Sequence, residues 1–267
     1  MSGAEGRRGS LIATFSTVVF FTLLVVLITH APGWPEVRKT FFDWGQFKDS
    51  LPDIARAFLL NVKIFCISEA FILVFALLLA VIRSLPGPAA LPLRILGIAY
   101  ADFFRGVPTI LVIAMLGFGA PALQLKGVPL STTFWGIVAL VLVYTAYVSE
   151  VYRAGIESVH PSQAAAARSL GLTHWQSLRT VVLPQAVRRV IPPLLNDFIG
   201  LQKDTALVGF LGSVEAFKQS QIDAAATFNY TSYVAAALLF VALTVPLARF
   251  TDWLVLRDRR RRQAASV

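Results

Sequence analysis

The chain has 267 residues, of which 56% are hydrophobic and only 15% are charged. A soluble domain of this length needs more charge to cover its surface, and the apolar residues here gather in runs long enough to span a bilayer. The formal net charge is +9, but the arginines lie mainly at the ends of apolar runs, where they set orientation rather than bind nucleic acid. The composition therefore predicts an all-α integral membrane protein.

Six spans are expected in chain order. They cover residues 11–29, 57–82, 103–122, 132–151, 191–211 and 233–256. A helix of about 20 residues crosses the roughly 30 Å hydrocarbon layer. The third span is the weakest, because Arg105, Gly106 and Pro108 interrupt its start. The first run is longer than a signal-peptide core and no small-residue cleavage site follows it, so we expect a retained span.

The basic residues predict the orientation. An N-terminus in the cytoplasm places the loops after the second, fourth and sixth spans on the same side. That side then holds Arg7, Arg8, Arg83, Arg94, Arg105, Arg153, Arg168, Arg179, Arg188, Arg189, Arg257 and the arginines at 259–262. The other side holds Arg38, Lys39, Lys48, Arg56, Lys126 and Lys218. Because Lys and Arg accumulate in cytoplasmic loops, we expect both termini in the cytoplasm.

The stretch between the first two spans, residues 30–56, is rich in Trp, Phe and Pro. This composition is typical of an external loop whose aromatic rings lie at the level of the lipid headgroups. The alternative is a docking surface for an external partner.

Polar residues interrupt the second and fifth spans. Lys63 lies near the outer end of its span and can reach the headgroups, whereas Glu69 lies deeper; six residues apart, they point to different faces of the helix. Ionisable groups at membrane depth usually face the bundle interior or an aqueous path. The candidate residues for a substrate pathway or gate are Glu69, Asn196, Asp197, Lys203, Asp204 and Thr205. The alternative is that Lys203 pairs with a carboxylate and only fixes helix packing.

A basic segment, residues 161–193, separates the fourth and fifth spans. Its first helix is expected to begin with Ser162 as N-cap, directly after Pro161. Four alanines favour the helix, and Gly171 suits the left-handed position that ends it.

The second helix of this segment is expected to begin at a capping box formed by Thr173 and Gln176. Trp175, Leu178 and Val182 then share one apolar face. Pro184 is expected to end this helix, and the prolines at 192 and 193 to start the next span. The result is a helix–turn–helix outside the bilayer. Taken alone, the segment also fits an amphipathic helix lying on anionic lipid.

The order of residues in this segment resembles the cytoplasmic signature of the permease subunits of ATP-binding-cassette importers. The signature is Glu-Ala-Ala, three residues, Gly, nine residues, Ile, one residue and then Leu-Pro. Its matches here are Ala166, Ala167, Gly171, Leu183 and Pro184, with Val181 in the Ile place. The motifs YADFFRGVP, SEVYRAGIESV, LPQAVRRVIPPLLN and LQKDTALV resemble the polar amino-acid subfamily. The resemblance covers about residues 55–257.

This resemblance implies a type I importer permease fold of about six transmembrane helices in a bacterial inner membrane. Residues 1–54 are then an added N-terminal span with its external loop, residues 55–257 the transport domain, and residues 258–267 a basic cytoplasmic tail. The implied helix that couples to the ATPase contains Ser162, Gln163, Ala165, Ala166, Ala167, Arg168, Leu170 and Gly171. The implied partners are an ATPase dimer, a second permease chain (identical or homologous) and an external amino-acid-binding protein.

Three positions depart from the family pattern. Ala165 stands where the signature has Glu, which puts the usual polar contact with the ATPase in doubt. Ala206 stands where the family commonly has Ser. Glu69 is unusual in its region of the family and is therefore a candidate for a property specific to this transporter.

The chain has no G-x-x-x-x-G-K-[ST] phosphate loop, so it is not expected to be catalytic or to bind a cofactor. ATP and magnesium are expected on the partner subunit. Cys66 is the single cysteine and the three histidines are scattered, so no metal site is expected. The alternative function is an ion-coupled secondary transporter, although the inverted repeat typical of that class is not evident. The substrate stays open, because both charge signs occur at membrane depth.

Overall fold

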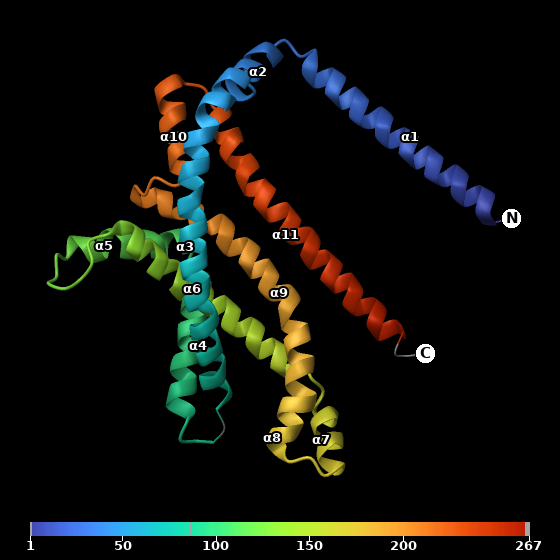
Figure 1. The fold of residues 1–267 in the computed structure, drawn as a ribbon, viewed down its shortest axis with the longest axis vertical. Coiled ribbons are helices and arrows are strands. Elements are labelled where there is room, and N and C mark those ends of the chain that lie inside the picture. The colour runs from blue at the N-terminus through green and yellow to red at the C-terminus, as the bar shows by residue number, and fades with distance from the viewer. Residues whose placement is uncertain (1, 86, 265–267) are drawn as a thin grey trace.

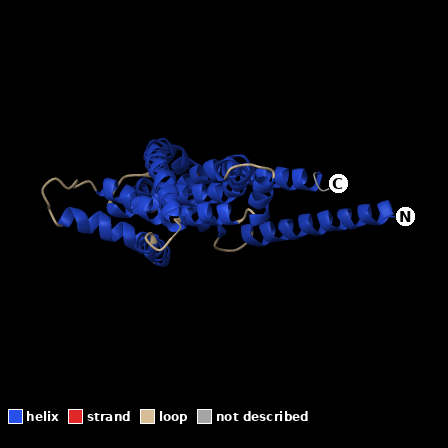
Figure 2. Cartoon of the chain, turned by 90° about the horizontal axis from the view of Figure 1, so that it is seen from below, coloured by secondary structure: helices blue, strands red, loops and turns tan. Residues whose placement is uncertain are grey.

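The computed structural model describes residues 2–85 and 87–264 (Figure 1). These residues form helices and loops without strands, which confirms the expected all-α fold (Figure 2). The α-helices are α1 (Ser2–Thr29), α2 (Trp34–Phe41), α3 (Trp44–Ser84), α4 (Leu91–Gly106), α5 (Thr109–Ala122), α6 (Thr132–Glu157), α7 (Pro161–Ser169), α8 (His174–Ser177), α9 (Leu183–Asp204), α10 (Ala216–Thr227) and α11 (Thr231–Ala264). A π-helix, η1 (Leu178–Val182), joins α8 to α9, and a 3-10 helix, η2 (Thr205–Leu211), follows α9.

Helix α1 extends away from the rest of the molecule (Figure 1). It contains the expected first span. None of the side chains in its apolar window, Ile12–Thr29, is buried inside the chain. A helix that is apolar on all sides is stable only where lipid or protein surrounds it, so α1 is built for contact with the bilayer.

The region expected as an external loop is mostly helical, so that prediction was wrong. Residues 34–41 form α2, and α3 begins at Trp44, well before the expected start of the second span at residue 57. The side chain of Asp43 caps α3 by accepting hydrogen bonds from the backbone N–H of Gly45 (2.8 Å) and Gln46 (3.2 Å). With 41 residues, α3 is about 60 Å long, so its first turns project beyond the bilayer. The expected boundary at residue 54 falls inside this helix.

The third expected span is broken. Helix α4 ends at Gly106, and α5 begins at Thr109 at an angle of 100° to it. Pro108 disfavours the helical conformation of the residue before it, and Val107 accordingly adopts φ −92° and ψ 132°. A single helix from residue 103 to 122 is therefore wrong, and the break falls at the residues that weakened this span in the sequence.

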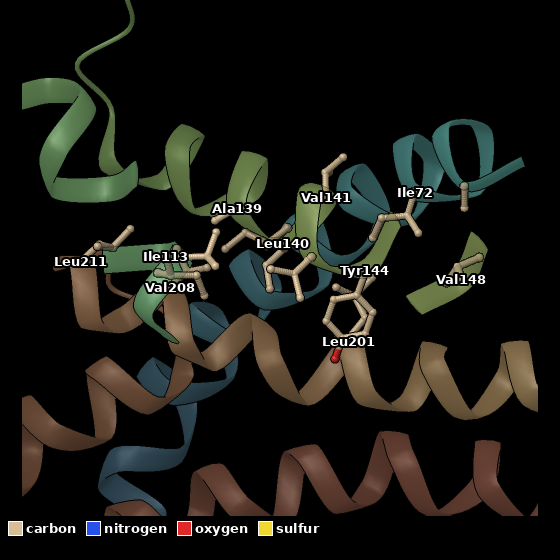
Figure 3. Close-up of a cluster of buried hydrophobic side chains, with 14 residues drawn as sticks. Ile72, Ile113, Ala139, Leu140, Val141, Tyr144, Val148, Leu201, Val208 and Leu211 are labelled. Atoms are coloured by element: carbon tan, nitrogen blue, oxygen red, sulfur yellow. The ribbon is translucent and has the colours of Figure 1, made fainter. Parts of the chain in front are cut away.

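The core surrounds α6, which is buried by α3, α5 and α9. It combines Ile72 of α3, Ile113 of α5, Leu140 of α6, Leu201 of α9 and Val208 of η2 (Figure 3). A smaller cluster of Ile54, Ala216, Ala235 and Ala236 joins α3 to α10 and α11. The short loops and the apolar stripes of these helices thus build a bundle in which α6 is central.

The fifth span begins earlier than expected. The prolines at 192 and 193 were expected to start it, but they lie inside α9, which begins at Leu183. Pro184 does not end a helix either: it occupies the first turn of α9, where its missing N–H is not needed for an intrahelical hydrogen bond. Helix α9 then changes into η2 at Thr205 instead of continuing as an α-helix to residue 211.

Four helices of the described chain are long and apolar enough to cross a membrane, or five if α4 and α5 together count as one broken span. They match the first, second, fourth and sixth expected spans, and α4–α5 the third. Helix α9 is the fifth, and its polar residues keep it out of that group, so the total of six stays a prediction. Helix α11 continues past residue 256 into the basic tail, of which residues 265–267 lie outside the described residues.

Candidate functional site

Helix α7 begins two residues earlier than expected. His160, not Ser162, is its N-cap: the His160 Nδ1 accepts a hydrogen bond from the Ser162 backbone N–H (3.2 Å) and lies 2.7 Å from the Ser162 Oγ. Pro161 occupies the first helical position, which its fixed φ favours, so the cap has to be the residue before it. The predicted cap at Ser162 was therefore wrong.

The end of α7 is as predicted. Gly171 has φ +86°, a left-handed conformation that only glycine adopts without strain. Its N–H donates to the Arg168 carbonyl (3.0 Å), and the Leu172 N–H donates to the Ala167 carbonyl (3.2 Å). These two bonds are the Schellman arrangement that closes a helix, so the turn after α7 has a fixed direction.

The capping box of α8 is also confirmed. The Thr173 N–H donates to the Gln176 Oε1 (2.9 Å), and the Gln176 N–H donates to the Thr173 Oγ1 (3.3 Å). The buried Ser177 hydroxyl donates to the Ala164 carbonyl (3.4 Å) and so ties α8 to α7. The expected apolar stripe is only partly present, because Trp175 is 67% exposed.

We call residues 161–182 the coupling segment; it lies at one end of the bundle, beyond α6 and α9 (Figure 1). Of the eight residues predicted for it, only Ala167 is buried. Leu170 is 85% exposed, and no Asp or Glu occurs between residues 161 and 182. The surface of this segment therefore combines the exposed Leu170 and Trp175 with the basic side chains of Arg168 and Arg179.

Charged residues hold the end of α6 next to the coupling segment. Arg83 of α3 lies 2.9 Å from Glu150 of α6, and Arg153 pairs with both Glu150 and Glu157. Arg189 of α9 donates to the Ser158 carbonyl at the end of α6. Arg153 and Arg189 therefore fix the local structure, whereas Arg179 and Arg188 are exposed and free to face a partner.

Two of the predicted pathway residues are buried to different degrees. Glu69 of α3 is 7% exposed, and Asp197 of α9 is half-buried. Lys63, by contrast, is exposed, so the prediction that it faces another side of α3 is confirmed.

Asp197 also lines a cavity of about 350 Å³ between α4, α6 and α9. Arg105, Tyr147 and Arg189 contribute further polar groups to its wall. The Oδ2 of Asp197 is buried and accepts no hydrogen bond from the described residues. A buried carboxylate oxygen without a donor is costly unless a ligand or water satisfies it, so the cavity has the chemistry of a polar ligand site.

The other predicted pathway residues do not join this cavity. Asn196 and Lys203 are exposed, and none of the ion pairs between described residues includes Lys203. Asp204 accepts a hydrogen bond from the Tyr144 hydroxyl (3.0 Å), and Thr205 is fully buried. The predicted set is therefore not one site. Asp197 lines the cavity and Glu69 is buried on α3, whereas Asn196 and Lys203 are exposed and Asp204 and Thr205 lie where α9 changes into η2.

Sequence reasoning missed Asn61, Tyr144 and Glu215, which are buried in the bundle interior, and Tyr147, which is exposed and lines the cavity. Asn61 offered a signal, since it is a lone amide in an apolar run. Glu215 precedes a helix as an N-cap, but its full burial depends on residues far away in the chain.

Comparison with known proteins places the chain in a family. Residues 92–260 match the family described as "Binding-protein-dependent transport system inner membrane component". The chain is 33% identical over 204 residues to the probable amino-acid permease protein YxeN of Bacillus subtilis, which covers 76% of this chain and 90% of the relative. It is 36% identical over 164 residues to the probable glutamine ABC transporter permease protein GlnM of the same organism, covering 61% and 74%.

A solved structure is similar to this chain in fold. The crystal structure of an amino acid ABC transporter superposes with a TM-score of 0.72 at 27% identity, covering 82% of this chain and 98% of that one. The family match covers more than half of the chain. The chain is therefore a member of the family of inner membrane components of binding-protein-dependent transport systems.

Proposed function

We propose that this protein is the permease subunit of an ATP-driven importer that carries a polar amino acid across the bacterial inner membrane. The observation that carries the proposal is the coupling segment. Its residues follow the spacing of the permease signature, it contains no Asp or Glu, and it is exposed at one end of the bundle. The names of YxeN and GlnM support an amino-acid substrate. Nothing in the comparisons favours an ion-coupled transporter.

The partners follow from the family. Two ATPase subunits, which bind ATP and magnesium, receive the coupling segments, and a second permease chain completes the path. An external binding protein delivers the substrate. The positive-inside pattern supports a cytoplasmic location of the coupling segment and of both termini.

The cavity at Asp197 is proposed as part of the path. Arg105 and Arg189 on its wall offer donors for a carboxylate, and Asp197 offers an acceptor for an ammonium group. An α-amino acid carries both groups. Closure of the ATPases moves α7 and α8, and because α9 continues directly from η1, that displacement reaches the wall of the cavity.

The experiment compares Gly171→Glu with Gly127→Glu in the complex reconstituted with its ATPase and binding protein. Both glycines have a positive φ, +86° and +82°, and a Cβ at either meets no atom within 4 Å. The backbone strain of the two substitutions is therefore matched. We expect Gly171→Glu to separate ATP hydrolysis from amino-acid uptake, because a carboxylate enters the docking surface. Gly127→Glu, in the loop between α5 and α6, keeps the two coupled. Normal coupled uptake by Gly171→Glu would refute the assignment.

A further inference from the structure

A cluster of buried polar side chains lies at the end of α9 opposite the coupling segment. It consists of Asn61 on α3, Thr205 at the start of η2 and Glu215 at the N-cap of α10. Asn61 is 1% exposed, and Thr205 and Glu215 are fully buried. Three helical elements that are distant in the sequence thus meet at one polar contact.

The amide of Asn61 is fully used. Its Nδ2 donates to the Thr205 Oγ1 (3.1 Å) and to the Glu215 Oε2 (2.9 Å). Its Oδ1 accepts from the backbone N–H of Ala216 (3.0 Å). One side chain of α3 therefore holds both the start of η2 and the start of α10.

Glu215 is held by donors rather than by a cation. Its carboxylate accepts from the backbone N–H of Phe217 (2.9 Å) and Lys218 (2.8 Å) as well as from Asn61, and none of the ion pairs between described residues includes it. Burying a carboxylate is costly unless all its acceptor sites are satisfied. An exposed Ser or Asp caps a helix at lower cost, so capping alone does not explain a fully buried Glu.

The backbone of η2 passes very close to the Glu215 carboxylate. A Cβ on Gly209 of η2 would lie 2.1 Å from the Glu215 Oε1. The close approach of η2 to Glu215 therefore requires glycine at this position. The Thr205 hydroxyl also donates to the Gln202 carbonyl (2.7 Å) in the last turn of α9, which links the cluster to α9 itself.

Helix α9 connects this cluster to the coupling segment. It starts directly after η1, which packs against α7, and its 22 residues span about 33 Å. Helix α9 runs as one helix from the end next to α7 and α8 to the end next to η2 (Figure 1). We propose that Asn61, Thr205 and Glu215 form a latch, in which Asn61 and Glu215 are positioning residues that make the η2–α10 segment move with α9. This proposal rests on the proposed ATP-driven function.

The test measures that movement without any substrate. Val214 precedes Glu215 and is 47% exposed, so Val214→Cys, in a Cys66→Ser background, reports on the η2–α10 segment. The permease–ATPase complex in nanodiscs is labelled with a hydrophilic maleimide, with no nucleotide or with ATP and vanadate. We expect the labelling rate to change roughly fivefold or more between the two states. Fivefold is about the smallest effect that typical coupling free energies between two sites produce.

Asn61→Ala is expected to abolish this nucleotide dependence while ATP hydrolysis continues. Asn61→Asp places two carboxylates against each other and has the same effect. Thermal unfolding of each complex shows whether the variants remain folded.

Several results would overturn the latch. One is a labelling rate in the unmodified complex that does not respond to nucleotide, because the η2–α10 segment then does not move. Another is an Asn61→Ala complex that is less stable but responds as the unmodified one does, because the cluster is then only structural. A folded Asn61→Asp complex that responds as the unmodified one does would also contradict the pairing. A complex that does not hydrolyse ATP at all contradicts the proposed function instead.

Discussion

At the scale of single residues, the most informative group is the carboxylate of Asp197. Its Oδ2 is buried and accepts no hydrogen bond from the described residues, although two arginines and a tyrosine share its cavity. Proteins seldom bury such an oxygen without a partner. In the proposed function, the ammonium group of the amino acid supplies this donor when the transport path opens around Asp197.

Asp197→Asn tests this account. The substitution preserves the shape of the side chain and removes its charge, so we expect amino-acid uptake by the full complex to fall about tenfold or more, the effect of losing one hydrogen bond to a charged group. Basal ATP hydrolysis is expected to stay near its normal rate, because the coupling segment is unchanged.

The matched control is Asp102→Asn on α4, whose carboxylate is exposed. It is expected to leave uptake unchanged. Equal uptake by Asp197→Asn and the unmodified protein would exclude Asp197 from the path.

At the scale of elements, the sequence predicted best where the signals were local. Gly171 ends α7 and the Thr173–Gln176 box begins α8, because each signal acts over three or four residues. The break at Pro108 was visible as a weakness, but its angle of 100° depends on what α4 and α5 pack against. The prolines around α9 led to a wrong prediction. Pro184 lies in the first turn of α9 and Pro192 within it, and the sequence alone does not distinguish these two positions.

The site was predicted only in part for a related reason. Glu69 and Asp197 were found because charge is rare at membrane depth. The contact between Asn61 and Glu215 joins residues 154 positions apart, and no local pattern reports such a pairing. The same holds for Tyr144, whose hydroxyl meets Asp204 across two helices.

Helix α1 gives a prediction at this scale. Because none of Ile12–Thr29 is buried inside the chain, its sequence carries no packing information for the bundle. Replacing residues 12–29 by a run of leucines, with Arg7 and Arg8 kept, is expected to leave the unfolding temperature of the purified protein and the uptake by the complex unchanged. Loss of uptake with an unchanged unfolding temperature would show instead that α1 contacts another subunit.

At the scale of the whole molecule, the proposed function depends on α9, which connects two ends of the bundle. Helices α7 and α8 lie at one end of α9 (Figure 1), and the buried cluster of Asn61, Thr205 and Glu215 meets η2 at the other end. The residues of α9 that line the Asp197 cavity come between these ends. Helix α6, packed on α3, α5 and α9, gives α9 a fixed neighbour to move against. In the proposed function, α9 therefore contacts the docking site of the ATPase at one end, lines the path in its middle and moves the η2–α10 segment at the other end.

The arrangement works only if the coupling segment faces the cytoplasm, where ATP is available, and this orientation is testable. Arg168, Arg179 and Arg188 are exposed on that side, and moving such charges across a bilayer is strongly unfavourable. In a Cys66→Ser background, Gln163→Cys on α7 and Lys126→Cys in the loop between α5 and α6 are each exposed. We expect a membrane-impermeant maleimide to label Lys126→Cys in intact spheroplasts but to label Gln163→Cys only after lysis, with both reacting equally in detergent as the control. Labelling of Gln163→Cys in intact spheroplasts would reverse the orientation, and no cytoplasmic ATPase could then reach the coupling segment.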